Sequence, residues 1–174
     1  MTSTDLGTDD DFAAWYAATF PRVRAAVTLG VGDAWLAEEA TAEAYARALA
    51  RWRVVRDMRR PEAWVYTVAL NHVRSRLRRL RLERRYLARQ QAGYEPPPPE
   101  PDTALWAAVA ALPPRARTAV ALRYVADLSE AEVAAAMGIS RGTVAATLHK
   151  ARARLAELMG PQPTTTDVTE RTTS

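Results

Sequence analysis

The sequence of 174 residues contains no cysteine, two histidines and a single lysine. The absence of cysteine excludes disulfide bonds, thiolate metal sites and thiol catalysis. His72 and His149 are too far apart in the sequence to indicate a metal pair. No Gly-rich phosphate loop is present, and no nucleophile with a base and an orienting group is marked out. We therefore predict a protein that is not an enzyme and that needs no cofactor or metal.

Long hydrophobic runs and strand signals are also missing. No stretch is apolar over the length needed to cross a membrane, and nothing resembles a signal peptide, so we expect a cytoplasmic protein without membrane insertion. Apolar residues recur at spacings of three and four through most of the chain, whereas β-branched runs and two-residue hairpin turns are rare. The sequence predicts an all-α fold.

Positive charge is concentrated in the middle of the chain. Residues 51–89 hold thirteen arginines against three acidic residues, a local net charge of +10, whereas the whole chain carries +4. The N-terminus is acidic, with Asp5 and the run Asp9–Asp11. This distribution indicates a polyanion, such as nucleic acid, as the partner of the middle segment.

Residues 129–154 have the pattern of a helix-turn-helix: a short capped helix, a turn centred on glycine, and a longer helix with a basic end. Ser129 and Glu132 predict a capping box for the first helix, and Ser140 is placed to cap the second. Gly138 is placed for the positive φ of the turn. The expected apolar seam between the two helices consists of Val133, Met137, Ile139, Val144 and Leu148.

The remaining helices are placed by the same signals. In chain order we expect a helix from about Asp11 that Pro21 kinks or restarts, one from Asp33 to about Trp52, a loop over Arg53–Arg60, a helix from Pro61 to about Arg89, one over Ala104–Leu112, and one from Pro113-Pro114 to about Val125.

The prolines of residues 94–101 exclude a helix there and predict an extended segment. We therefore expect two small helical domains joined by a Pro-rich linker. The boundaries are 9–91 for the first domain, 92–103 for the acidic linker, 104–159 for the second domain, and 160–174 for a Thr-rich disordered tail. Each domain is small enough to have a thin core.

Two groups of motifs resemble regions 2 and 4 of bacterial sigma factors. Those of region 2 are Gly32-Asp33, Ala37-Glu38-Glu39, Pro61-Glu62-Ala63-Trp64, and Asn71 before Leu77-Arg78-Arg79. Those of region 4 are Leu112-Pro113-Pro114-Arg115, Leu122-Arg123-Tyr124, Asp127-Leu128-Ser129 and Met137-Gly138-Ile139-Ser140. Two regions joined by a short linker resemble the extracytoplasmic-function, or ECF, type. The resemblance covers about residues 11–159. It implies a protein that binds core RNA polymerase, directs it to promoters through the −10 and −35 elements, and promotes DNA opening.

The resemblance also implies where polymerase binds. Glu39, Glu43 and Arg47 match positions that dock on the clamp helices of the largest polymerase subunit. Carboxylates four residues apart share one face of a helix, where a basic partner can pair with them. Spacing alone favours a solvated helix face over a polymerase contact. Ala42 departs from the glutamine that is usual in the family.

For the −10 element, Asn71 and Ser75 match positions that contact unpaired bases, and an amide offers such a base both a donor and an acceptor. We expect Arg53–Arg60 to form a wall of the base pocket and the arginines to hold phosphates. The −10 residues implied are Arg56, Arg59, Arg60, Asn71, Arg74, Ser75 and Arg78. Trp64 and Tyr66 are further candidates for base stacking, but for Trp64 a place in the core is favoured. His72 is expected on the surface, within reach of a phosphate. Outside the family pattern, Asn71 fits an ordinary exposed helix residue.

For the −35 element, burial of the apolar seam leaves Thr143, Thr147, Lys150 and Arg154 on the opposite side of the recognition helix. Ser140 and Arg141 lie with Thr143 at its N-terminus, where backbone amides favour a phosphate. Ala145 and Ala146 replace residues that are commonly polar in the family. We therefore predict modest −35 specificity that depends on methyl contacts, DNA shape and phosphates.

The implied partners are promoter DNA, an anti-sigma factor, and core RNA polymerase through its clamp helices and the flap of its second-largest subunit. One alternative is a helix-turn-helix regulator that is not a polymerase subunit. That alternative does not explain Asn71 within an arginine-rich helix. A decoy that binds polymerase without recognising promoters is a second alternative.

Overall fold

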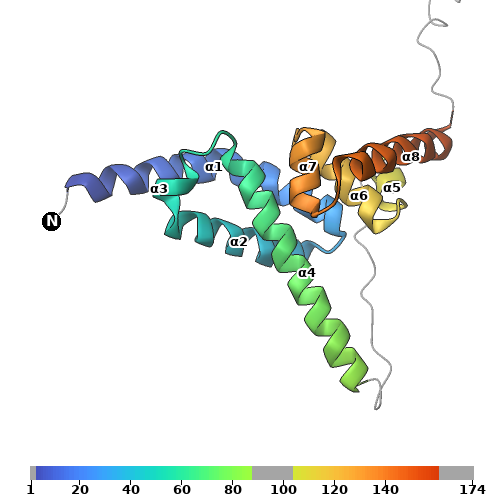
Figure 1. The fold of residues 1–174 in the computed structure, drawn as a ribbon, viewed down its shortest axis with the longest axis horizontal. Coiled ribbons are helices and arrows are strands. Elements are labelled where there is room, and N and C mark those ends of the chain that lie inside the picture. The colour runs from blue at the N-terminus through green and yellow to red at the C-terminus, as the bar shows by residue number, and fades with distance from the viewer. Residues whose placement is uncertain (1–2, 88–103, 161–174) are drawn as a thin grey trace, which may run out of the picture.

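The computed structural model describes residues 3–87 and 104–160 of the chain (Figure 1). All regular structure in these residues is helical, which confirms the all-α prediction. The N-terminal half comprises α1 (Ser3–Val31), α2 (Ala34–Ala50), α3 (Trp52–Val55) and α4 (Pro61–Leu87). The C-terminal half comprises α5 (Ala104–Ala110), α6 (Pro114–Val120), the π-helical η1 (Ala121–Val125), α7 (Glu130–Met137) and α8 (Arg141–Met159). The expected linker over 92–103 and the expected tail beyond Gly160 lie outside the described residues. Within the described residues, no helix is long and apolar enough to cross a membrane.

Helix α1 differs from the prediction. It begins before Asp11 and continues through Pro21 to Val31, so the expected restart at Pro21 is wrong. Pro21 lies at an exposed position, whereas Val23 and Val27 on the next turns are buried. A proline costs a helix one backbone hydrogen bond, and packing against α2, α4 and α6 compensates for that loss.

An aromatic cluster joins the N-terminal part of α1 to α2 and α3. The Trp15 and Trp52 rings lie 4.8 Å apart, Phe12 meets Trp52 edge-on at 5.2 Å, and Trp15 lies 5.2 Å from Tyr45. Trp52 and Val55 are both buried, so the segment expected to be a loop from residue 53 begins instead with the helical turn α3. Burial of these two side chains explains why a turn of helix forms there.

Helices α2 and α4 form the centre of the N-terminal half. The Asp33 side chain caps α2 by accepting a hydrogen bond from the Leu36 amide at 2.9 Å, as predicted. The predicted stripe of α2 is buried, consisting of Leu36, Ala40, Ala44, Ala48 and, just beyond the helix, Trp52. The small alanines allow α1 and α4 to pack closely against α2.

The helix-turn-helix has the predicted local structure. Ser129 and Glu132 form the capping box of α7, Gly138 adopts φ 64° in the turn, and the Ser140 hydroxyl accepts from the Thr143 amide. Val133, Val144 and Leu148 of the seam are buried, while Met137 and Ile139 are half-buried.

The two halves pack against each other and share one hydrophobic core (Figure 1). Helix α6 and η1 lie against α1, and α7 lies against α4. The last turn of α1 is capped by the C-terminal half, because Thr118 donates to the Gly30 carbonyl at 2.9 Å and Arg117 donates to the Val31 carbonyl at 3.0 Å. The last carbonyl groups of a helix lack partners within the helix, and their partial negative charge favours a nearby cation. Thr118 and Arg117 supply the missing hydrogen bonds, and Arg117 also supplies the positive charge.

Candidate nucleic-acid and polymerase interfaces

Asn71 lies on the exposed face of α4 beside a cavity of about 270 Å³. The Arg74 guanidinium donates to the Asn71 side-chain oxygen at 2.7 Å and so fixes the orientation of the amide. Asn71 and Ser75 line the cavity from α4, and Glu39 and Arg47 line it from α2, together with His72, Arg76 and Arg79. None of residues 53–60, the expected wall of a base pocket, is among the side chains that line this cavity.

Glu39 and His72 pair across the same cavity. The His72 Nε2 lies 3.2 Å from Glu39 Oε1, and the second Glu39 oxygen is buried without a hydrogen-bond partner among the described residues. Glu39 thus points towards α4, and His72 is half-buried instead of lying freely on the surface. Glu43 and Arg47 form an ion pair at 2.7 Å on the more exposed side of α2. The three predicted polymerase-binding residues thus lie together on one side of α2, with the Glu39 and Glu43 side chains exposed to similar extents, 35% and 39%.

Tyr66 is completely buried, so it does not lie where a base can stack on it. Trp64 is half-buried and packs against the core. Burial raises the pKa of the Tyr66 hydroxyl far above its ordinary value. The stacking role proposed for Tyr66 from the sequence is wrong, because its position on α4 faces α1 and α2.

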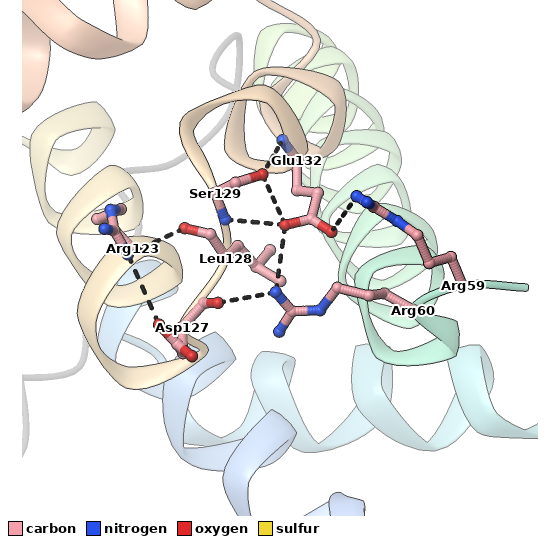
Figure 2. A network of polar contacts seen from close by, with 7 residues as sticks. All are labelled: Arg59, Arg60, Arg123, Asp127, Leu128, Ser129 and Glu132. Carbon is pink, nitrogen blue, oxygen red and sulfur yellow. Dashed lines mark hydrogen bonds and ion pairs between the residues drawn. The ribbon is translucent and has the colours of Figure 1, made fainter.

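Figure 2 shows Arg59 and Arg60 reaching towards the first helix of the helix-turn-helix. Arg60 donates to the Asp127 carbonyl at 3.0 Å and to the Glu132 carboxylate at 3.3 Å, and Arg59 lies 4.0 Å from the other Glu132 oxygen. Burial raises the pKa of Glu132, but hydrogen bonds from Ser129 and the two arginine charges outweigh it and hold that pKa below its ordinary value. This carboxylate therefore carries its charge at neutral pH.

Arg74 also contacts the C-terminal half, donating to the Ala136 carbonyl of α7 at 2.9 Å. Burial, and then the nearby charge of Arg115, lower the pKa of Arg74. Arg56 instead pairs with Asp11 at 3.6 Å and with Asp57 at 3.7 Å, and Arg78 is exposed. Three of the predicted −10 residues are thus in contact with α7 or the residues just before it.

The recognition helix α8 presents its predicted −35 side to solvent. Thr143, Lys150 and Arg154 are exposed, and Thr147 is half-buried with its hydroxyl donating to the Thr143 carbonyl at 2.7 Å. At the N-terminus of α8 the Ser140 and Thr143 hydroxyls lie 2.8 Å apart. Arg141 and Arg154 pair with Glu130 and Glu157 at 3.7 and 2.8 Å.

This architecture defines a class of protein: a helical DNA-binding protein with a cationic helix in one half and a helix-turn-helix in the other. The family model for region 4 of sigma-70 matches residues 102–155. The chain is 35% identical to the RNA polymerase sigma-E factor of Streptomyces coelicolor over 131 residues, which are 70% of each chain. It is also 35% identical to the RNA polymerase sigma-E factor of Streptomyces antibioticus over 127 residues, covering 70% of this chain and 69% of that one.

The fold is similar to that of the sigma factor RpoE of Bartonella quintana, solved in complex with the anti-sigma factor NepR. The TM-score is 0.70 at 22% identity, covering 86% of this chain and 96% of that one. The chain belongs to the ECF sigma factors, and it is therefore a sigma factor that directs RNA polymerase to promoters. The alternative of a regulator that is not a polymerase subunit is not favoured.

Proposed function

We propose that three separate surfaces divide the work of this sigma factor. The outer side of α2 binds the clamp helices of core polymerase, the exposed face of α4 binds the −10 strand, and the outer side of α8 binds the −35 duplex. In this proposal residues 9–91 and 104–159 act as the two functional units, connected by residues 92–103.

The proposed polymerase-binding surface is the side of α2 that the other described residues leave uncovered. Trp35 is 69% exposed and Leu49 is 49% exposed, and both lie on the side opposite the buried alanine stripe. Glu43 and Arg47 lie near this side as an ion pair. Exposed large apolar side chains next to charged ones are typical of a docking surface with an apolar centre and a polar rim. Glu39, whose side chain is 35% exposed, lies one turn before Glu43 and pairs with His72.

A binding assay with core polymerase tests this surface. Trp35→Ala and Glu43→Gln should each weaken the complex, because an apolar anchor and a rim charge are lost. Glu157→Gln is the matched control for Glu43→Gln, since Glu157 also pairs with an arginine of its own helix, at 2.8 Å, but lies on α8. Equal affinities of Trp35→Ala, Glu43→Gln and the unchanged chain for core polymerase would contradict a polymerase interface on α2.

The observation that carries the −10 assignment is the position of Asn71. Its amide lies exposed beside the cavity and is oriented by Arg74, with Arg76 and Arg79 along the same opening. An amide next to a cavity provides hydrogen bonds for an unstacked base, and the surrounding guanidinium groups provide contacts for its phosphates. Ser75 lies one turn further along the same lining.

The matching experiment separates polymerase binding from promoter opening. Promoter-dependent transcripts are first obtained from a library of genomic fragments with core polymerase and this chain. Asn71→Ala should then retain core binding and lose opening, measured by permanganate reactivity of unpaired thymines. Unchanged opening would refute the −10 role of Asn71, and failure of the unchanged chain to bind core would refute the whole division of surfaces.

The −35 assignment depends on the exposed side of α8, which carries Thr143, Lys150 and Arg154. Ala145 and Ala146 between them offer no hydrogen bonds to base edges, so we propose that α8 mainly positions the duplex through phosphates and groove shape. Single-base changes in the −35 element should therefore reduce transcription less than changes in the −10 element. Equal losses for both elements would contradict this.

Two further partners complete the proposal. The second half binds the flap of the second-largest polymerase subunit, and an anti-sigma factor keeps the chain inactive in the cytoplasm. The complex of the Bartonella quintana relative with its anti-sigma factor supports the second partner. The anti-sigma factor is tested by purifying the tagged chain from cells in which its promoters are silent. Co-purification of a small protein that blocks core binding would support this partner, and purification of the chain without any partner would contradict it.

A further inference from the structure

A cavity of about 300 Å³ lies where α4 meets the C-terminal half, and it shares no lining residue with the cavity at the proposed −10 surface. Leu70, Val73 and Leu77 line it from α4, and Met137 and Ile139 line it from the helix-turn-helix. The lining contains no aromatic ring. It therefore lacks the stacking surface on which proteins hold single-stranded nucleic acid, and its chemistry points to another kind of ligand.

The apolar side chains of this lining are only partly covered. Leu77 is 38% exposed, and Met137 and Ile139 are half-buried, whereas Leu70 and Val73 are buried. An aliphatic group in the cavity removes this apolar surface from water, and each methylene that becomes fully buried raises the affinity by about fourfold. The lining thus favours a ligand with an aliphatic body.

Two cationic side chains, Arg74 and Arg115, also line the cavity, and no acidic side chain of the described residues does. The Arg115 guanidinium makes no hydrogen bond or ion pair within residues 3–87 and 104–160. Arg74 donates to Asn71 and to the Ala136 carbonyl, which leaves further N–H groups of its guanidinium available. The two cations lie close enough for the charge of Arg115 to add to the larger effect of burial in lowering the pKa of Arg74. An anion beside both arginines relieves this repulsion.

We propose that this cavity binds a small amphiphilic carboxylate, an aliphatic chain with one ionised head group. The chain lies among the apolar residues of the lining, and the carboxylate accepts hydrogen bonds from Arg115 and Arg74, since guanidinium groups match the geometry of a carboxylate. An engineered apolar cavity of about 150 Å³ holds benzene, so a cavity of about 300 Å³ holds about twelve non-hydrogen atoms. That size corresponds to a straight-chain carboxylate of about eight to ten carbons.

The methionines provide a direct test of where such a ligand binds. The chain has four methionines, and Met137 lines the cavity, whereas Met58 and Met159 do not. The full-length chain is labelled with carbon-13 at its methionine methyl groups, and nuclear magnetic resonance spectra are recorded as octanoate is added up to about 10 mM. The spectrum of Met137→Leu lacks one signal and so assigns the signal of Met137. The sample contains neither DNA nor polymerase, so the result is independent of the proposed function.

The Met137 signal should shift saturably, with a dissociation constant of about 1 mM, which is ordinary for a ligand of this size in a partly open cavity. The signals of Met58 and Met159 should stay in place. Absence of a saturable shift at Met137 would overturn the proposal. Equal shifts of all three signals would also overturn it, because they indicate non-specific association with exposed apolar surface.

A series of straight-chain carboxylates tests the apolar part of the site. From butanoate to octanoate, the affinity should rise by about two- to fourfold for each added methylene, since a partly open cavity buries each methylene incompletely. Equal affinities for butanoate and octanoate would contradict the proposed place of the aliphatic chain.

Arg115→Gln tests the charged part of the site. It should weaken octanoate binding by about fivefold, a moderate loss because water reaches the exposed Arg115 side chain. Binding of octan-1-ol, which has the same chain and no charge, should not change, and this result also shows that the variant is folded.

Arg53→Gln is the matched control for Arg115→Gln. Arg53 is also exposed, and its guanidinium has no hydrogen-bond or ion-pair partner among the described residues, but it is not part of the lining. Arg53→Gln should bind octanoate like the unchanged chain. Equal octanoate affinities for the two variants, or equal losses of octanoate and octan-1-ol affinity in Arg115→Gln, would overturn the proposal.

Discussion

Two buried tyrosines of the N-terminal half differ in the hydrogen bonding of their hydroxyl groups. The Tyr45 hydroxyl lies 2.8 Å from the Thr19 hydroxyl, and because Thr19 donates its own proton to the Trp15 carbonyl at 2.7 Å, Tyr45 is the donor. The Tyr66 hydroxyl is buried and has no hydrogen-bond partner among residues 3–87 and 104–160. The same substitution, Tyr→Phe, should therefore have opposite effects at the two positions.

The magnitudes follow from these partners. Tyr66→Phe removes a desolvated hydroxyl and should raise the free energy of unfolding by about 1 kcal/mol, the lower end of the cost of an unpaired buried polar group. Tyr45→Phe removes one buried hydrogen bond and should lower it by about 1 kcal/mol. Thr19 keeps its bond to Trp15, so the Tyr45→Phe loss does not include an unpaired threonine.

Urea unfolding followed by circular dichroism measures both free energies, and the melting temperatures should move in opposite directions by about 2–4 °C. Neither hydroxyl ionises in the working range, because burial raises the pKa of Tyr45 to about 12 and that of Tyr66 further still. A loss of stability in Tyr66→Phe equal to that in Tyr45→Phe would refute the argument and indicate a partner for the Tyr66 hydroxyl.

Three further predictions concern backbone conformation, pH and the α8 cap. Gly32→Ala should destabilise the chain by about 2 kcal/mol or more, because φ is +78° and the new Cβ would displace the Arg117 guanidinium from its bonds to the Val31 and Ala110 carbonyls. Gly138→Ala, with φ +64° and the Arg74 guanidinium in ordinary contact at 3.9 Å from the new Cβ, should lose only about 1 kcal/mol in the same urea assay, and equal losses would contradict the role of Arg117. Folding lowers the pKa of Glu132 below 4.5, so the stability that this carboxylate contributes is present above pH 4.5 and is lost as the pH falls through its pKa in the folded chain. Melting temperatures measured between pH 6 and 3 should therefore fall further for the unchanged chain than for Glu132→Gln. Parallel curves for the two chains would contradict this contribution. Ser140→Ala should cost about 1 kcal/mol by removing the α8 cap, and an unchanged urea midpoint would contradict this.

Local features of the fold were predictable from the sequence. The capping box at Ser129, the positive φ of Gly138, the cap at Asp33 and the buried alanine stripe of α2 all match the structure. Each depends on residues within four positions of one another, so the sequence contains the necessary information.

Features that depend on contacts between distant segments were not predictable in this way. The continuity of α1 through Pro21 depends on packing against helices from both halves, and α3 forms because Trp52 and Val55 are buried against α1 and α2. Spacing placed Glu39 on one stripe with Glu43, but the pairing of its carboxylate with His72, 33 residues away on α4, depends on how the two helices pack.

The sequence by itself determined the helices, the helix-turn-helix, the cationic middle segment and the resemblance to sigma factors, because periodicity, caps and charge are local properties. The tertiary structure alone decided which arginines are engaged. Arg59, Arg60 and Arg74 are all cationic residues of the same segment, yet their partners lie on and just before α7, more than 60 positions along the chain. Such contacts form only when the two halves pack together, because that packing brings residues that are distant in the sequence within hydrogen-bonding distance.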